Sequence, residues 1–240
     1  MRNILGFLFS AIFLFSCDNG ISFDDPALDA CVRNATPITD ESHLDQSDLD
    51  KITTLVCGED TPGFEENGIS NLSGIERLHN LRYLNLYKAK VSNISLLAKL
   101  EKLKELNITS DQKILSYEPL TRLPLTFLGI HDTGLEDISF LANIPTLEEI
   151  DLERNAIIDI SVLAQLDKLV DVDLQHNKIT TVAPLAQNKN LANMERLAIY
   201  YNCIDCMKEI EYLDAIAEQN PDLKYICNPD DQLLPENCGE

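Results

Sequence analysis

Leucine and isoleucine return at a regular spacing between positions 81 and 202, while the residues between them change. An opening of the form Leu-x-x-Leu-x-Leu, or a close variant, recurs with a period of 22 residues. Self-similarity at such a period is typical of solenoid proteins, in which each repeat is one structural unit. The openings lie at Leu81, Leu103, Leu125, Leu147 and Leu169, and a sixth at Met194 follows after 25 residues.

The spacing of the apolar residues changes inside each unit, whose positions we number from the opening residue as place 1. The opening alternates apolar and variable residues, which is the spacing of a β-strand. Later apolar residues fall three apart, at places 11, 14, 17 and 20. This suits a tight turn followed by 3₁₀ or irregular backbone. Because one unit cannot bury its apolar edge alone, we expect stacked units about 4.8 Å apart, with a parallel sheet on one side and a continuous leucine core.

The units Leu147 to Leu166 and Leu169 to Leu185 match the pattern LxxLxLxxNxIxxIxxLxxL most closely. Through these motifs, about half of the chain resembles bacterial leucine-rich repeats of the internalin type. The resemblance implies the α/β class: a leucine-rich repeat solenoid with a concave parallel β-sheet, a convex side of 3₁₀ and irregular backbone, and a cap at each end. It also implies a role in protein binding, with which internalin-type proteins are associated.

Small side chains, most of them polar, occupy place 9, where the chain turns inward from the strand. Backbone groups lose their sheet partners there, and an asparagine amide can hydrogen-bond such groups in adjacent units. We expect this role wherever the residue is asparagine, whereas Ala89 cannot perform it. The residues at place 9 are Ala89, Asp111, Thr133, Asn155, Asn177 and Asn202.

The N-terminus has the pattern of an export signal. A charged start is followed by an apolar run from Ile4 to Phe15, which is shorter than the roughly 20 residues of a membrane span. The run ends in Leu14-Phe15-Ser16-Cys17, which resembles a bacterial lipobox and predicts cleavage before Cys17 and acylation of that cysteine. The alternative is an ordinary signal in which the cysteine is accidental. The lipobox places the protein in the bacterial cell envelope, lipid-anchored to the inner or outer membrane.

The chain divides into five expected segments. They are a lipoprotein signal at 1–17, a short tether at 18–22, an N-terminal cap with a degenerate first repeat at 23–80, repeats at 81–204 and a C-terminal cap at 205–240. The N-terminal cap should begin with a helix after the Asp-Pro pair at Asp25. In the C-terminal cap, one predicted helical face comprises Met207, Ile210, Leu213 and Ala217, and residues 223–227 are a candidate strand.

Six cysteines remain beside Cys17. An even count in an exported chain predicts disulfides. We expect Cys31 to pair with Cys57, because both lie in the N-terminal cap. A redox role for the Cys-x-x-Cys pair, Cys203 and Cys206, is disfavoured because this pair closes a repeat. A four-cysteine zinc site is disfavoured because Cys227 and Cys238 are too far apart in sequence. The four C-terminal cysteines allow three pairings, among which the sequence does not choose: Cys203, Cys206, Cys227 and Cys238.

Forty acidic residues against 19 basic ones give a net charge of −21. Phosphate binding requires the opposite sign, so nucleic acid is excluded as a partner and the lipid anchor is the only expected membrane contact. A protein partner with a basic surface, or a cation, fits this charge. We expect a monomer.

Strand residues that point away from the core fall at places 2, 3, 5, 7 and 8 and bring acids from neighbouring units together. Like charges near 5 Å apart repel unless a basic partner or a cation compensates them. Aromatic residues, which often anchor interfaces, lie at the two ends of the same face and at its centre. We predict partner binding by Tyr83, Tyr87, Phe127, Glu149, Asp151, Glu153, Asp171, Asp173, Tyr200 and Tyr201. The simpler interpretation is a soluble face with scattered tyrosines, and alternative ligands are a carbohydrate or calcium.

Catalysis and cofactors have little support in the sequence. Ser110, His131 and Asp132 could approach one another on adjacent strands, but no Gly-x-Ser-x-Gly motif is present. We therefore expect no catalytic residues and no cofactor. We also expect no dedicated metal site, because no two histidines have ligand spacing along the chain: His43, His79, His131 and His176.

Overall fold

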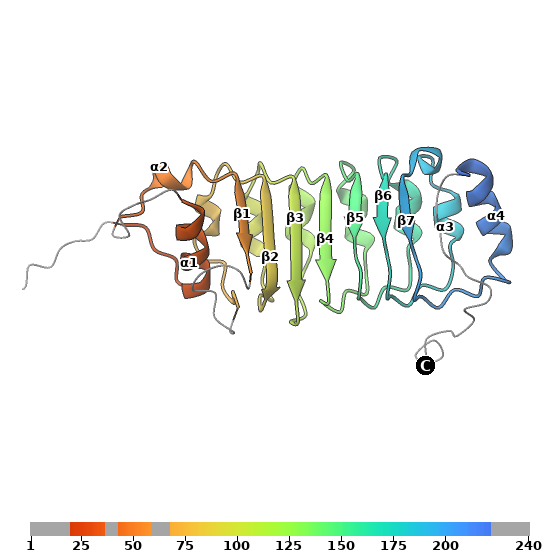
Figure 1. The fold of residues 1–240 in the computed structure, drawn as a ribbon, viewed down its shortest axis with the longest axis horizontal. Coiled ribbons are helices and arrows are strands. Elements are labelled where there is room, and N and C mark those ends of the chain that lie inside the picture. The colour runs from red at the N-terminus through yellow and green to blue at the C-terminus, as the bar shows by residue number, and fades with distance from the viewer. Residues whose placement is uncertain (1–19, 37–42, 59–67, 222–240) are drawn as a thin grey trace, which may run out of the picture.

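The structure, a computed structural model, describes residues 20–36, 43–58 and 68–221. Its centre is one sheet of seven parallel strands, in which each strand lies beside its neighbour in sequence. The segments that connect the strands lie behind the sheet in Figure 1, so that the chain forms an elongated coil. This is the predicted leucine-rich repeat solenoid with a parallel sheet on one side and 3₁₀ turns on the other.

The helices and strands alternate along the chain as the repeat pattern requires. The strands are β1 (Thr54–Cys57), β2 (Tyr83–Ala89), β3 (Glu105–Ser110), β4 (Phe127–His131), β5 (Glu149–Asp151), β6 (Asp171–Asp173) and β7 (Arg196–Ala198). The return segments contain η1 (Ile75–Arg77), η2 (Ser95–Lys99), η3 (Glu118–Arg122), η4 (Ser139–Asn143), η5 (Ser161–Gln165), α3 (Ala183–Ala186) and η6 (Leu191–Asn193). The remaining helices are α1 (Pro26–Ala35), α2 (Gln46–Leu49) and α4 (Ile210–Gln219).

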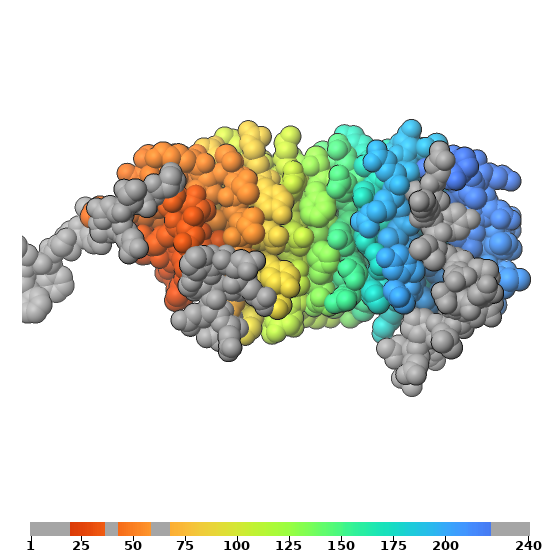
Figure 2. All heavy atoms as spheres, in the orientation of Figure 1, coloured from red at the N-terminus to blue at the C-terminus, as the bar shows by residue number. Residues whose placement is uncertain are grey.

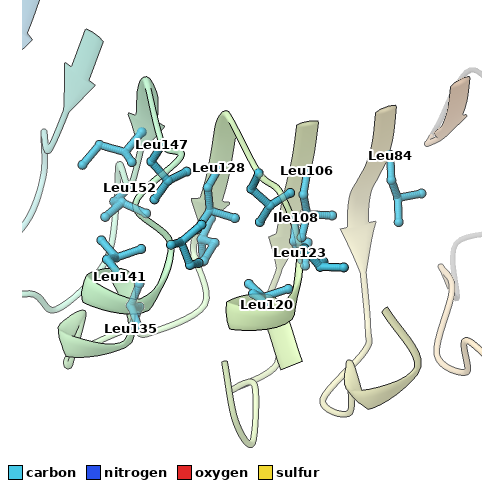
Figure 3. Close-up of a cluster of buried hydrophobic side chains, with 14 of the residues drawn as sticks. Leu84, Leu106, Ile108, Leu120, Leu123, Leu128, Leu135, Leu141, Leu147 and Leu152 are labelled. Atoms are coloured by element: carbon cyan, nitrogen blue, oxygen red, sulfur yellow. The ribbon is translucent and has the colours of Figure 1, made fainter. Parts of the chain in front are cut away.

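The core is one column of aliphatic side chains that runs through all the repeats. Leu84, Leu106 and Leu128 are register partners on successive strands, and each is fully buried. Figure 3 shows them beside Leu120 and Leu141 from the return segments. Burial of each such side chain contributes about 1.5–3 kcal/mol. Since strand residues alternate in direction, this core leaves the intervening strand positions on the opposite face, which we call the sheet face.

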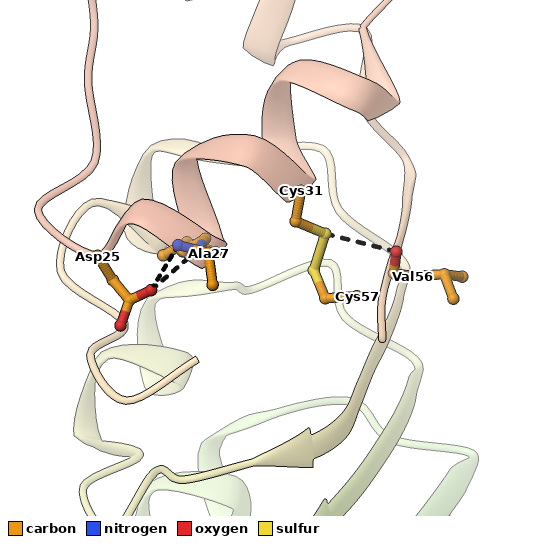
Figure 4. Close-up of a disulfide and its surroundings, with 6 residues drawn as sticks. Asp25, Ala27, Cys31, Val56 and Cys57 are labelled. Atoms are coloured by element: carbon orange, nitrogen blue, oxygen red, sulfur yellow. Dashed lines mark hydrogen bonds between the residues drawn. A yellow bond between two sulfur atoms is a disulfide. The ribbon is translucent and has the colours of Figure 1, made fainter. Parts of the chain in front are cut away.

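The N-terminal cap is fastened to the sheet by a disulfide. Helix α1 carries Cys31, and its sulfur is bonded to Cys57 at the end of β1, with a Cα separation of 5.6 Å. This confirms the predicted pair. The sulfur of Cys31 also lies 3.4 Å from the Val56 carbonyl oxygen, and because a disulfide sulfur has no proton to donate, this is a packing contact (Figure 4).

Asp25 ties the start of α1 to the first repeat. Its Oδ1 accepts hydrogen bonds from the backbone N–H groups of Ala27 and Leu28, at 3.0 and 3.1 Å. Its Oδ2 accepts from the backbone N–H groups of Ser70 and Asn71, at 2.8 and 3.0 Å. Burial would raise the pKa of Asp25, but these hydrogen bonds outweigh it and hold the pKa below its ordinary value of 3.8.

Asp25→Asn should lower the free energy of unfolding by about 2 kcal/mol at pH 7, because an amide N–H₂ would face the donors of Ser70 and Asn71. A group whose folded-state pKa is lowered stabilises the fold above its unfolded pKa and loses this effect as pH falls through the folded pKa. The difference between the two proteins should therefore shrink below pH 3.8. Urea unfolding of both at pH 7 and pH 3 measures it, and a difference that stays constant would contradict the role of the ionised carboxylate.

The C-terminal cap differs from its predicted form. Helix α4 begins only at Ile210 and buries Leu213 and Ile216. Met207 and Ile210 are 65% and 51% exposed, so the predicted helical face is wrong for these two residues. Met207 precedes the helix because residues 205–208 form a turn, and Ile210 is the first residue of the helix and is exposed.

Several sequence predictions concern residues outside the described ranges. They are the signal segment with Cys17, the candidate strand at 223–227, and Cys227 and Cys238. Cys203 and Cys206 are both disulfide-bonded, as predicted, and the pairing of the C-terminal four stays open. In the described ranges, no helix combines the length and apolar character that crossing a membrane requires.

Candidate binding face

The sheet face aligns the predicted acidic residues in rows. Across β5 and β6, Glu149 is the register partner of Asp171, and Asp151 is the partner of Asp173. The rows continue to Phe127 on β4 and to Arg196 on β7. These alignments confirm that the 22-residue period places the same positions of successive units side by side. Figure 2 shows this side of the molecule, where the colours follow the sequence from the N-terminal to the C-terminal end of the array.

Arg196 compensates one half of the acidic patch from within the chain. Its Nε lies 2.8 Å from Asp171 Oδ1, and its Nη1 lies 2.9 Å from Asp173 Oδ2. Gln175 Nε2 also donates to both oxygens of Asp173, at 2.9 and 2.7 Å. Asp173 is only 5% exposed. The expectation that Asp173 is an uncompensated residue on the surface is therefore wrong, because internal donors surround its carboxylate.

Among the residues that the structure describes, no arginine pairs with the acids of the other half of the patch, Glu149 and Asp151 on β5. Partial burial and then the charges of Asp171 and Glu105 raise the pKa of Glu149 above its ordinary value of 4.5. Burial also raises the pKa of Asp151. The charge of His131 lowers this pKa and the charge of Asp173 raises it, so that the pKa of Asp151 lies above its ordinary value of 3.8. A raised pKa means that the ionised carboxylate is less stable at these two positions than in water.

His131 and two carboxylates converge beside β5. The ring nitrogen Nε2 of His131 lies 3.5 Å from Asp151 Oδ2. Ligand atoms of His131, Asp151 and Glu153 all lie within 4.8 Å of one another. Glu153 also forms an ion pair of 3.2 Å with the exposed side chain of Arg154. We did not predict this group from spacing along the chain because its members come from adjacent units. The signal in the sequence was a histidine at place 7 of one unit and an acid at place 5 of the next.

The predicted aromatic residues form two separate clusters at opposite ends of the array, with half-buried Phe127 between them. At the N-terminal end, Tyr87 is 41% exposed and its ring lies 5.4 Å from Lys88 Nζ, while Tyr83 is half-buried. At the C-terminal end, Tyr201 is 60% exposed, stacks on His176 with ring centroids 4.3 Å apart, and meets the half-buried ring of Tyr200 edge-on at 5.2 Å.

A residue with left-handed backbone follows each of the strands β4 to β7, and one lies inside β2. Non-glycine residues with positive φ occur at place 8 of five units, and the sequence pattern did not predict them. The conformation costs about 1–2 kcal/mol for a residue with a Cβ. It turns the chain sharply at the edge of the sheet face, where two of these residues, His176 and Tyr201, form the aromatic stack. The five are Lys88, Asp132, Arg154, His176 and Tyr201.

The suggested catalytic group is not assembled. Ser110 is fully buried, and its hydroxyl accepts a hydrogen bond from the backbone N–H of Gln112 at 3.1 Å. Within residues 68–221, no hydrogen bond joins Ser110 to His131, whose ring faces Asp151 instead. One surface depression, of about 740 Å³, lies among the return segments around Ile158.

No family model matches the chain, and no curated protein matches it. Solved structures do. Internalin C2 of Listeria monocytogenes is 26% identical with a TM-score of 0.57, over 85% of this chain and 94% of that one. A second internalin of the same organism is 22% identical with a TM-score of 0.57, over 85% and 75%. A leucine-rich repeat protein of Leptospira interrogans is 21% identical with a TM-score of 0.52, over 76% and 51%. The chain thus has an internalin-like leucine-rich repeat fold.

Proposed function

We propose that this chain is a non-enzymatic protein-binding module of the bacterial cell envelope, which holds a partner with a basic surface against its sheet face. The observation that carries the proposal is the pair of acids on β5, Glu149 and Asp151, which no arginine or lysine in the described part of the chain neutralises. A charged group whose ionised form is disfavoured in the free protein gains most when a cation from a partner approaches it. The exposed aromatic rings at either end of the face would supply apolar anchors for the same partner.

Glu149→Lys is the sharpest test of this face. Glu149 is exposed and lies beside Asp171, so lysine should relieve repulsion and leave the fold at least as stable. We expect the variant to lose at least about tenfold in affinity for the partner, because a like charge would now face the basic epitope. The measurement is crosslinking and pulldown from intact cells, followed by quantitative mass spectrometry of the captured proteins.

Glu101→Lys is the matched control, because Glu101 is equally exposed but lies in a turn between η2 and β3. It changes the net charge by the same amount and should capture the same proteins as the unmodified chain. Raising the salt concentration should weaken capture by the unmodified protein. Equal capture by Glu149→Lys and Glu101→Lys would reject the sheet face as the binding surface.

The second candidate function is carbohydrate or calcium binding on the same face. The stack of Tyr201 on His176 favours a carbohydrate, because its exposed ring can pack against the apolar side of a sugar. Titration calorimetry with glycans and with calcium separates these alternatives from protein binding. Tyr201→Ala should weaken a glycan complex, whereas Glu149→Lys should not.

The proposed envelope location depends on acylation of Cys17. Cells that express the full chain and grow with an alkyne fatty acid should label the unmodified protein, and the label should be lost in Cys17→Ala. The double variant Cys31→Ala/Cys57→Ala should keep its label, which excludes labelling through the cap cysteines. A labelled Cys17→Ala protein, or an unlabelled wild type in the soluble fraction, would favour the ordinary export signal.

A further inference from the structure

The group formed by His131, Asp151 and Glu153 has the composition of a metal site. His131 is at place 7 of one unit, and the two acids are at places 5 and 7 of the next. Their side chains are 15%, 27% and 29% exposed, respectively, so they are partly shielded from water but remain open to the sheet face. Their candidate ligand atoms lie within 4.8 Å of one another.

The distance between the first two ligand atoms fits a bridging ion better than a direct hydrogen bond. His131 Nε2 and Asp151 Oδ2 are 3.5 Å apart, at the outer limit for hydrogen bonding. Nitrogen and oxygen ligands of a tetrahedral zinc ion, with metal bonds near 2.0–2.2 Å, are about 3.4 Å from each other. An ion could therefore bind between these atoms without a rearrangement of the strands.

In the next repeat, side chains of the protein itself donate hydrogen bonds to the acid at the equivalent position. There Asp173 receives hydrogen bonds from Gln175 and Arg196. At Asp151, the backbone N–H of Glu153 donates to Oδ1 at 3.3 Å, and Oδ2 faces the histidine. Place 7 carries Glu153 instead of glutamine, and a carboxylate cannot donate to its neighbour. Among the described residues, Asp151 thus lacks the glutamine and arginine donors that Asp173 has, while Glu153 is paired with Arg154 at 3.2 Å.

We propose that His131, Asp151 and Glu153 bind a divalent transition-metal ion of the Zn²⁺ class, with a fourth coordination position open on the sheet face. An imidazole with two carboxylates suits zinc, whereas calcium prefers a larger set of oxygen ligands. The site does not depend on the proposed partner. If both exist, a side chain of the partner can complete the coordination of the ion.

The test is calorimetric titration of Zn²⁺ alone into the untagged, oxidised full chain after treatment with a chelator. We expect one bound ion per chain. His131→Gln and Asp151→Asn should each weaken binding by at least about tenfold, since loss of supporting groups around a metal already costs 10–100-fold. His79→Gln is the control, because His79 forms a similar pair with Asp50, at 3.6 Å, without a third ligand.

A second measurement needs no variant. Adding Co²⁺ to the unmodified protein should selectively broaden or shift the NMR resonances of one histidine ring. The peak that is missing from the spectrum of His131→Gln identifies the resonance of His131. Binding that is equal in the wild type and His131→Gln, or a perturbed histidine other than His131, would overturn the site. Because no partner is present, these results are independent of whether the sheet face captures a protein.

Discussion

Asn177→Ala is expected to lower the free energy of unfolding by about 3 kcal/mol, because one side chain satisfies backbone groups of two repeats. Its Nδ2 donates to the carbonyl oxygens of Leu152 and Leu174, at 2.9 and 3.0 Å. Its Oδ1 accepts from the backbone N–H of Ile157 at 3.1 Å. Asn177 is 6% exposed, so alanine would leave these groups with neither a protein partner nor ready access to water.

Guanidinium unfolding measures the effect, and Asn193→Ala is the matched control. Asn193 is exposed, and its amide donates only to the side chain of Asn190, at 2.8 Å. We expect a change below about 0.5 kcal/mol for this control. If Asn177→Ala lowered the free energy of unfolding by less than about 1 kcal/mol, ordered water would have to replace the amide. The asparagines at place 9 would then not be what connects adjacent repeats.

The role of Asn177 could be predicted from sequence because the repeat fixes where the strand ends. Asn155 and Asn202 form equivalent bonds, as the pattern at place 9 predicted. Two other buried asparagines could not be found in this way. Asn188 donates to Leu163 and Leu166, and Asn220 donates to Leu191 and Met194. Asn188 lies where the fifth unit lengthens, and Asn220 lies where α4 ends, so both are outside the period that carried the prediction.

The binding face was predictable in its rows but not in its charge balance. The 22-residue period placed Asp151 beside Asp173, and the opening at Met194, 25 residues after Leu169, placed Asp171 beside Arg196. Which acid the arginine neutralises depends on the reach of its side chain, and Arg196 contacts both Asp171 and Asp173. The face therefore divides into a half on β6 and β7 that Arg196 compensates and a half on β5 whose acids pair with no arginine or lysine among the described residues. The second half is where both the proposed partner and the proposed ion would bind.

Removal of the disulfide in the variant Cys31→Ala/Cys57→Ala is expected to lower the free energy of unfolding by about 3.5 kcal/mol. The two cysteines are 26 residues apart in sequence. Closing a loop of that length in the unfolded chain accounts for a loss of this size in the chain-entropy model. The loss should be local, because the cap is the terminal element that shields the leucine core of a solenoid. Without the bond, α1 separates from β1 at lower free energy and exposes the first strands.

Hydrogen exchange followed strand by strand distinguishes this local effect from general destabilisation. Protection of β1 and β2 should fall most in the double variant, and protection of β5 and β6 should change little. A reductant also breaks the disulfide bonds of Cys203 and Cys206. In the double variant, the further decrease in protection on reduction therefore measures the contribution of the C-terminal disulfides alone. A uniform fall in protection along the whole sheet would mean that the array unfolds as a single unit, and that the N-terminal cap contributes to overall stability rather than closing one end.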